Sequence, residues 1–139
     1  MRYWDSSALL PLLVREDHSD ALEQLLAEDP AIVTWWGTPA ECVSALARLD
    51  RSESISPAGL RSALAALSAA QAHWLEVQAS TAVRDQTIRL LRVHQLSVGD
   101  ALQLGAALVA SGMQPGDLEF VSRSDRQVRA AEREGFQLP

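Results

Sequence analysis

The chain is poor in cysteine and has no lysine at all. Its one cysteine, Cys42, cannot form an internal disulfide, so the sequence is typical of a reducing compartment and we expect a cytoplasmic location. All 12 basic residues are arginines. This composition excludes reactions that need a lysine side chain, such as Schiff-base chemistry or the lysine of a phosphate-binding loop.

Long apolar runs are missing as well. No stretch approaches the roughly 20 uninterrupted apolar residues that cross a membrane. The apolar segment at residues 1–13 contains Asp5 and has neither a basic start nor a small-residue cleavage site. We therefore interpret this segment as a strand followed by the start of a helix, not as a signal peptide, and we expect no membrane partner.

Positive charge is scarce in this sequence. Its 18 acidic and 12 basic residues give a net charge of −6, whereas proteins that hold nucleic acid through bulk charge are basic. A nucleic-acid ligand would need a local cationic element, either bound metal ions or a few arginines. Candidates at near-helical spacing, with a solvated helix face as the alternative interpretation, are Arg123, Arg126, Arg129 and Arg133.

The length of 139 residues predicts a single domain, residues 1–139. Apolar runs of strand length alternate with helical periodicity, which is typical of the α/β class. We predict a three-layer α/β/α sandwich with a mostly parallel central sheet of about five strands. Strands are expected over residues 2–5, 31–35, 74–78, 119–122 and 136–138. Helices are expected up to residue 14, over residues 19–28, 38–50, 56–73, 81–93 and 98–111, and from the fourth strand to residue 134.

Four acidic residues stand where a helix begins. Asp5 ends the first strand, and each of the other three follows a Ser or Thr by three residues: Glu41 after Thr38, Asp100 after Ser97 and Asp125 after Ser122. A hydroxyl residue followed three positions later by an acid is an ordinary capping box, and the helix dipole favours acids in a first turn. Taken singly, these three acids are therefore interpreted more simply as helix caps than as ligands.

Taken together, the acids indicate a metal site. The helices that follow parallel strands start at the carboxyl edge of the sheet, where such folds bind ligands. Asp5, Glu41 and Asp125 are expected at this edge, while Asp100 follows a helix and is less constrained. Clustered carboxylates repel one another unless a cation lies between them, and Mg²⁺ is commonly held by one or two carboxylates and several waters.

These residues lie in segments that resemble the PIN-domain family. The matching segments, in order along almost the whole chain, are YWDSSALL with Asp5, PAECVSAL with Glu41, LSVGDALQLGAAL with Asp100, and EFVSRSDRQVRAAEREGF with Asp125. The last segment departs from the family pattern, because two residues instead of one separate Ser122 from Asp125. One extra residue turns a helical side chain by about 100°.

Small single-domain members of this family are mostly VapC-type toxins of VapBC toxin–antitoxin systems. The resemblance implies a Mg²⁺- or Mn²⁺-dependent endoribonuclease that acts on structured RNA such as tRNA. It also implies inhibition by a cognate antitoxin protein and a homodimer. Asp5, Glu41 and Asp100 match the metal ligands, Asp125 the fourth acid, and Ser7 the hydroxyl that supports the site.

The resulting hypothesis is that the acids hold one or two divalent ions, which activate water for attack on a phosphodiester. Two alternatives stay open: a PIN-like module that binds a partner without catalysis, and an α/β phosphotransfer protein with Asp5 as acceptor. Cys42 is interpreted as a core residue. A zinc site is not expected, because the three histidines show no ligand spacing: His18, His73 and His94.

Overall fold

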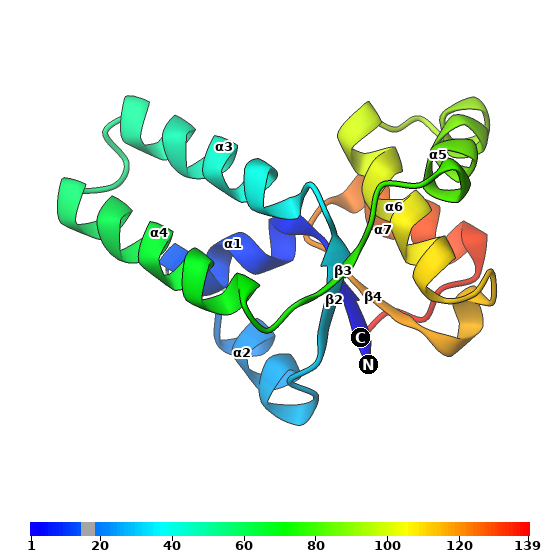
Figure 1. The fold of residues 1–139 in the computed structure, drawn as a ribbon, viewed down its shortest axis with the longest axis horizontal. Helices are drawn as coiled ribbons and strands as arrows, with labels where there is room; N and C mark the ends of the chain where they lie inside the picture. The colour runs from blue at the N-terminus through cyan, green and yellow to red at the C-terminus, as the bar shows by residue number, and fades with distance from the viewer. Residues whose placement is uncertain (15–18) are drawn as a thin grey trace.

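The computed structural model describes residues 1–14 and 19–139, so His18 lies outside the described residues. Figure 1 shows a central sheet between two groups of helices. The strands are β1 (Arg2–Trp4), β2 (Ile32–Trp35), β3 (Leu75–Val77) and β4 (Glu119–Val121). The helices are α1 (Ser6–Val14), α2 (Ser19–Glu28), α3 (Thr38–Arg51), α4 (Pro57–Gln71), α5 (Thr81–Val93), α6 (Val98–Ala110), the short 3₁₀ helix η1 (Pro115–Asp117) and α7 (Asp125–Glu134).

All strand pairs are parallel, in the order β3-β2-β1-β4. Helices α1 to α4 cover one face of the sheet and α5 to α7 cover the other, which confirms the α/β/α architecture (Figure 1). Among the described residues, no helix combines the length and the apolar character needed to cross a membrane.

The sheet has four strands where about five were predicted. The expected last strand contributes only one isolated bridge, between Glu119 and Gln137. The reason is that the Phe136 N–H donates to the Ala131 carbonyl at 3.0 Å and so completes the end of α7. That donor is therefore not available to the sheet, and Phe136 instead packs its ring 5.6 Å from Phe120.

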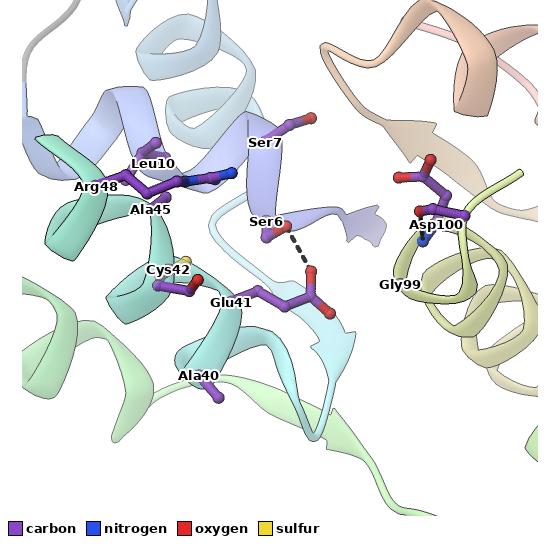
Figure 2. Close-up of a pocket in the computed structure, with 12 residues that line it drawn as sticks. Ser6, Ser7, Leu10, Ala40, Glu41, Cys42, Ala45, Arg48, Gly99 and Asp100 are labelled. Carbon is purple, nitrogen blue, oxygen red and sulfur yellow. Dashed lines mark hydrogen bonds between the residues drawn. The ribbon is translucent and has the colours of Figure 1, made fainter.

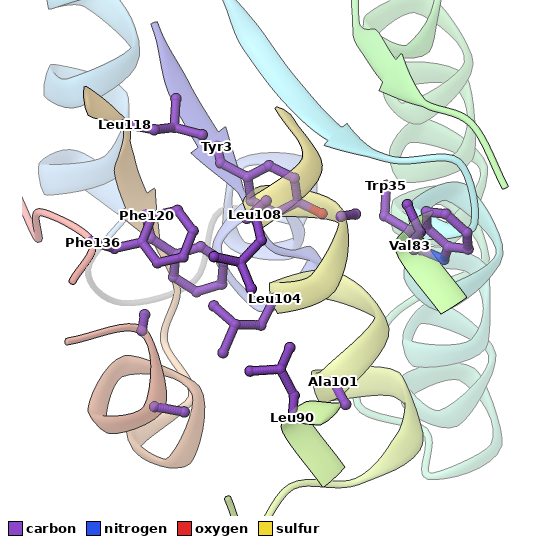
Figure 3. Packing of buried hydrophobic residues seen from close by; sticks show 14 of the residues in the cluster. Tyr3, Trp35, Val83, Leu90, Ala101, Leu104, Leu108, Leu118, Phe120 and Phe136 are labelled. Atoms are coloured by element: carbon purple, nitrogen blue, oxygen red, sulfur yellow. The ribbon is translucent and has the colours of Figure 1, made fainter. Parts of the chain in front are cut away.

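Alternating side chains of the strands build two separate cores. Tyr3 and Phe120 point toward α5 to α7 and stack at 5.5 Å, as Figure 3 shows. Their neighbours Trp4 and Val121 point toward α1 to α4. Successive strand residues face opposite sides of the sheet. A short strand that is buried on both faces therefore appears in the sequence as a continuous apolar run, which is why these strands could be predicted.

The order of the strands places a crevice between β1 and β4. The chain runs from β1 to β2 to β3 in one direction and then returns to place β4 on the other side of β1. Helix α1 leaves β1 toward one face, and α7 leaves β4 toward the opposite face (Figure 1). Adjacent parallel strands whose helices diverge leave an opening beyond their carboxyl ends, which is the usual ligand position in open α/β sheets.

Close packing of α5 against α6 depends on Gly105. A Cβ atom at this position would lie 2.8 Å from Thr87 Oγ1 and 3.2 Å from both the Thr87 nitrogen and the Val83 carbonyl oxygen. The Thr87 hydroxyl cannot move away freely, because it donates to the Val83 carbonyl at 2.8 Å. Any side chain here would therefore push the two helix backbones apart.

Gly105→Ala is expected to lower the free energy of unfolding by about 1–2 kcal/mol, because overpacking outweighs the gain in helix propensity. Gly99→Ala, in the first turn of the same helix, is the matched control, since its Cβ would meet only Ser97 Oγ, at 3.9 Å. This control is expected to be neutral or stabilising by up to about 1 kcal/mol. Urea denaturation measures both, and equal stabilisation by the two substitutions would contradict the packing argument.

Candidate functional site

The first strand delivers Asp5 directly into the crevice between β1 and β4. Its backbone N–H donates to the Val121 carbonyl at 3.0 Å and so extends the strand pairing by one residue. The side chain is 2% exposed. Its carboxylate accepts hydrogen bonds from the Ser7 N–H at 3.0 Å, from Ser122 Oγ at 3.2 Å and from Gln127 Nε2 at 3.2 Å. A buried carboxylate with this many donors stays compatible with a negative charge.

Ser7 holds the Asp5 carboxylate with both its backbone and its side chain. Its hydroxyl donates to Asp5 Oδ2, and its oxygen also accepts the Arg123 backbone N–H at 2.9 Å. The same hydroxyl lies 3.3 Å from Ser122 Oγ. Ser7 therefore ties the start of α1 to the segment that follows β4, across the crevice.

The Ser6 hydroxyl lies between Asp5 and Glu41. Ser6 Oγ donates to Glu41 Oε2 at 2.7 Å and lies 3.5 Å from Asp5 Oδ1. Figure 2 shows the bond to Glu41, which extends from α3 toward the start of α1. Gln103 Nε2 donates to the same Glu41 oxygen at 3.0 Å. No hydrogen bond to Glu41 Oε1 is formed within the described part of the chain, so this oxygen is available to a ligand.

Asp100 faces Glu41 across a pocket of about 620 Å³ whose walls also include Ser6, Ser7 and Arg48. The two carboxylates enter from opposite sides in Figure 2. Ser97 caps α6 by accepting the Asp100 N–H at 3.1 Å, which confirms that predicted cap. The capping bond uses only the backbone of Asp100, and its side-chain carboxylate, which lies 4.0 Å from Arg126 Nη2, can still serve the pocket. Capping and ligand binding are thus compatible at this residue.

The three carboxylates form one electrostatic group. Burial raises the pKa of Asp5, and its hydrogen bonds oppose this rise. Burial also raises the pKa of Glu41, against the bonds from Gln103 and Ser6, while the negative charges of Asp5 and Asp100 raise it further. The charge on Glu41 is therefore costly both because it is buried and because two other carboxylates are near, and a cation in the pocket would offset both effects.

The donor set fits a hard divalent cation better than zinc. Within residues 1–14 and 19–139, no three His, Cys, Asp or Glu side chains are close enough to hold an ion directly. The pocket offers carboxylate and hydroxyl oxygens and no histidine, and its one sulfur, on the buried Cys42, has a pKa raised to about 12 and so is unsuited to bind a metal as thiolate. Mg²⁺ and Mn²⁺ prefer oxygen ligands, and Mg²⁺ keeps several waters, which can bridge to carboxylates that do not all touch it.

Asp125 does not line the pocket that Glu41 and Asp100 share. Ser122, its predicted cap, instead bonds to Asp5 and Gln127, and Ser124 caps α7 by accepting the Gln127 N–H at 3.4 Å. Asp125 is consequently the first residue of α7 and is exposed. Gln127, two residues and about 200° further round the helix, is the α7 side chain that contacts Asp5.

The predicted cap of α3 is also wrong. Gly37 is the N-cap residue, and no side chain caps this helix end. Thr38 is buried and uses its hydroxyl differently: it lies 2.7 Å from Thr34 Oγ1 and accepts from Gln103 Nε2 at 2.9 Å. Thr38 does not cap the helix because its hydroxyl is buried beneath the site and bonds to the side chains of Thr34 and Gln103 instead.

Two buried glutamines were missed by the sequence analysis. Gln103 is fully buried, accepts the Tyr3 hydroxyl at 2.8 Å and donates to Thr38 and Glu41. Gln127, 1% exposed, bonds to Asp5 and donates to the Asp100 carbonyl at 3.4 Å. The available signals were the lone amide in the apolar helix DALQLGAAL and the Ser-x-x-Gln spacing at the start of α7.

Cys42 is a core residue, as predicted. It is fully buried beside Glu41 in the sequence. Burial, with the charges of Glu41 and Asp5, raises the pKa of the Cys42 thiol to about 12. A thiol with so high a pKa forms almost no thiolate near neutral pH, so Cys42 is unsuited to be a nucleophile.

A scan against protein-family models and a search of curated proteins found no match for the chain. The functional argument accordingly depends on the fold and the crevice. These define an α/β domain with a parallel sheet and, beyond its carboxyl edge, a half-buried Glu41 whose pKa is raised by burial and by the charges of Asp5 and Asp100.

Proposed function

We propose that the chain is a Mg²⁺- or Mn²⁺-dependent endoribonuclease of the PIN-domain type. The observation that supports this most directly is that Asp5 and Asp100, both remote from Glu41 in the sequence, lie close enough to this half-buried carboxyl to add to the rise in its pKa that burial causes. Such an arrangement costs stability unless it serves a cation. The resemblance of the four sequence segments to PIN domains supports the same function.

In this proposal Glu41 and Asp100 hold the ion, and Asp5 adds its charge from the buried floor of the crevice. When bound, the ion would neutralise a phosphodiester and lower the pKa of water for attack. Ser7, Ser122 and Gln127 keep Asp5 oriented and ionised through their hydrogen bonds. Gln103 and Ser6 hold one oxygen of Glu41, which fixes the direction of the other.

RNA is the proposed substrate, and Arg48 is the proposed contact for its backbone within the pocket. Arg48 lies on the α3 wall, and Figure 2 shows its guanidinium directed into the pocket. An arginine opposite a metal-bearing acidic site attracts phosphate while the acids alone would repel it. From the resemblance we further propose structured RNA such as tRNA, an inhibitory antitoxin protein, a homodimer and a cytoplasmic location.

A binding module without catalysis is the second candidate. Asp5 is 2% exposed and both of its oxygens accept hydrogen bonds, as in a purely structural carboxylate. The exposure of Asp125 supports this candidate too. The same burial weighs against a phosphotransfer protein, because an acceptor aspartate must present a free oxygen to its substrate.

The decisive experiment incubates the purified protein with total RNA in the presence of Mg²⁺ or Mn²⁺ and then in excess EDTA. We expect discrete fragments with either metal and none with EDTA. Glu41→Gln protein, purified in parallel, controls for contaminating nucleases and is expected to leave the RNA intact. Cleavage that persists in EDTA, or equally in the Glu41→Gln preparation, would reject the metal-dependent mechanism.

A further inference from the structure

A second, positively charged groove runs along α7. Arg126, Arg129 and Arg133 lie within about 60° of one another around the helix axis, and all three are exposed. Two acidic residues of the same helix turn away from this face, Glu132 by at least about 60° and Glu134 by about 80° or more, while Asp125, in the first turn, lies about 40° from Arg129. The helix therefore presents a stripe of guanidinium groups on a protein whose net charge is −6.

The stripe lines a groove of about 290 Å³, whose other wall is the 94–96 segment between α5 and α6. Glu134, the last residue of α7, is already engaged: it accepts hydrogen bonds from Arg89 and lies 2.7 Å from His94 Nε2. Within the described part of the chain, neither Arg129 nor Arg133 forms an ion pair. Among these described residues, the charges of Arg129 and Arg133 are thus not compensated by an ion pair, while Arg126 lies 4.0 Å from Asp100.

This α7 groove lies next to the carboxylate pocket. Arg126 Nη2 lies 4.0 Å from Asp100 Oδ2, and Asp100 is part of the pocket wall while Arg126 is part of the groove wall. A linear anion that emerges from the pocket past Asp100 would meet Arg126 first and then Arg129 and Arg133. The three arginines span about 10 Å along the helix, the length of roughly three stacked nucleotides.

We propose that the α7 groove binds the phosphate backbone of a single RNA strand whose scissile linkage lies in the carboxylate pocket. This inference rests on the proposed function, since it extends that site. One guanidinium group can donate hydrogen bonds to two oxygens of a phosphate at once, and such contacts do not depend on the base sequence. The contact between Arg126 and Asp100, which joins the groove wall to a pocket suited to phosphodiester chemistry, favours RNA over an acidic polypeptide.

Fluorescence anisotropy with a labelled single-stranded RNA, in EDTA so that no cleavage occurs, tests this groove. The test variant is Arg129→Gln with Arg133→Gln. The matched control is Arg51→Gln with Arg61→Gln, which makes the same charge change on α3 and α4, across the sheet. Each phosphate contact on a single strand contributes about 0.7 to the slope of log K against log salt. For the test variant we expect the slope of log K against log salt to be less steep by about 1.4 and RNA binding to be about 25-fold weaker at 0.1 M salt. The control variant is expected to bind RNA like the wild type.

Equal binding by the wild type and the test variant would overturn the inference, as would equal weakening by the control variant. Tighter binding of polyglutamate than of RNA, dependent on Arg129 and Arg133, would also overturn it in favour of an acidic polypeptide. The assay needs no catalysis. Arginine-dependent RNA binding without any cleavage would therefore reject the nuclease proposal alone, and cleavage without arginine-dependent binding would reject the groove alone.

Discussion

Replacing Asp5 with asparagine is expected to slow metal-dependent RNA cleavage by about 100-fold or more, the usual effect of removing one preorganised charge from an active site. Asparagine keeps the shape of the side chain but removes its charge. The Ser7 and Ser122 hydroxyls can rotate to accept from the new amide, so we expect the fold to survive. Cleavage of labelled RNA under single-turnover conditions measures the effect, and circular dichroism checks the fold.

Two further aspartate-to-asparagine substitutions make this prediction specific. Asp85→Asn changes an exposed residue on α5 that lies 4.0 Å from Arg84, remote from the crevice, and should leave the rate unchanged. Asp125→Asn measures what the fourth predicted acid contributes. Because Asp125 is exposed and Gln127 takes the place beside Asp5, we expect its rate within about threefold of the wild type. If Asp125→Asn slowed cleavage as much as Asp5→Asn, Asp125 would have to be a residue of the metal site.

Divalent ions are expected to stabilise the protein strongly at neutral pH. A ligand present at 100 times its Kd stabilises the folded state by about 2.7 kcal/mol, which raises the Tm of a domain this size by roughly 10 °C. Mg²⁺ and Mn²⁺ should both produce a shift, because they share the preference for oxygen ligands. Differential scanning fluorimetry across a metal titration measures it.

The pH dependence has a definite sign. Folding raises the pKa of Asp5 and of Glu41, so the folded state holds these protons more tightly than the unfolded chain does. Without metal, this contribution to stability is complete below about pH 4, the unfolded value, and is lost as the pH rises through the raised folded values. Metal competes with these protons, so the metal-induced shift in Tm should grow over the same range.

Glu41→Gln provides the control for this second prediction. It removes the charge that faces Asp100 across the pocket and should abolish most of the metal-induced shift, while Asp85→Asn should retain it. The variant should also flatten the pH dependence of stability in the absence of metal. Equal metal shifts in the wild type and Glu41→Gln would place the ion elsewhere on the protein.

Element types and boundaries were largely predictable. Helix α5 begins and ends at the predicted residues, and the Ser56-Pro57 start of α4 is confirmed by the bond from Gly59 N–H to Ser56 Oγ. These signals are local, because a cap and a short apolar run act over a few residues. The predicted fifth strand does not form, because the Phe136 N–H, which could have paired in the sheet, instead donates to the Ala131 carbonyl at the end of α7.

The sequence by itself determined that Asp5, Glu41 and Asp100 stand at the starts of helices, with Ser7 beside Asp5. Only the tertiary structure decided which side chains of α6 and α7 turn into the crevice. There Gln103 and Gln127 contact the carboxylates, and Asp125 faces solvent. The physical reason is that one residue rotates a helical side chain by about 100°. The phase of each helix is thus set by packing against the sheet, which no short stretch of sequence contains.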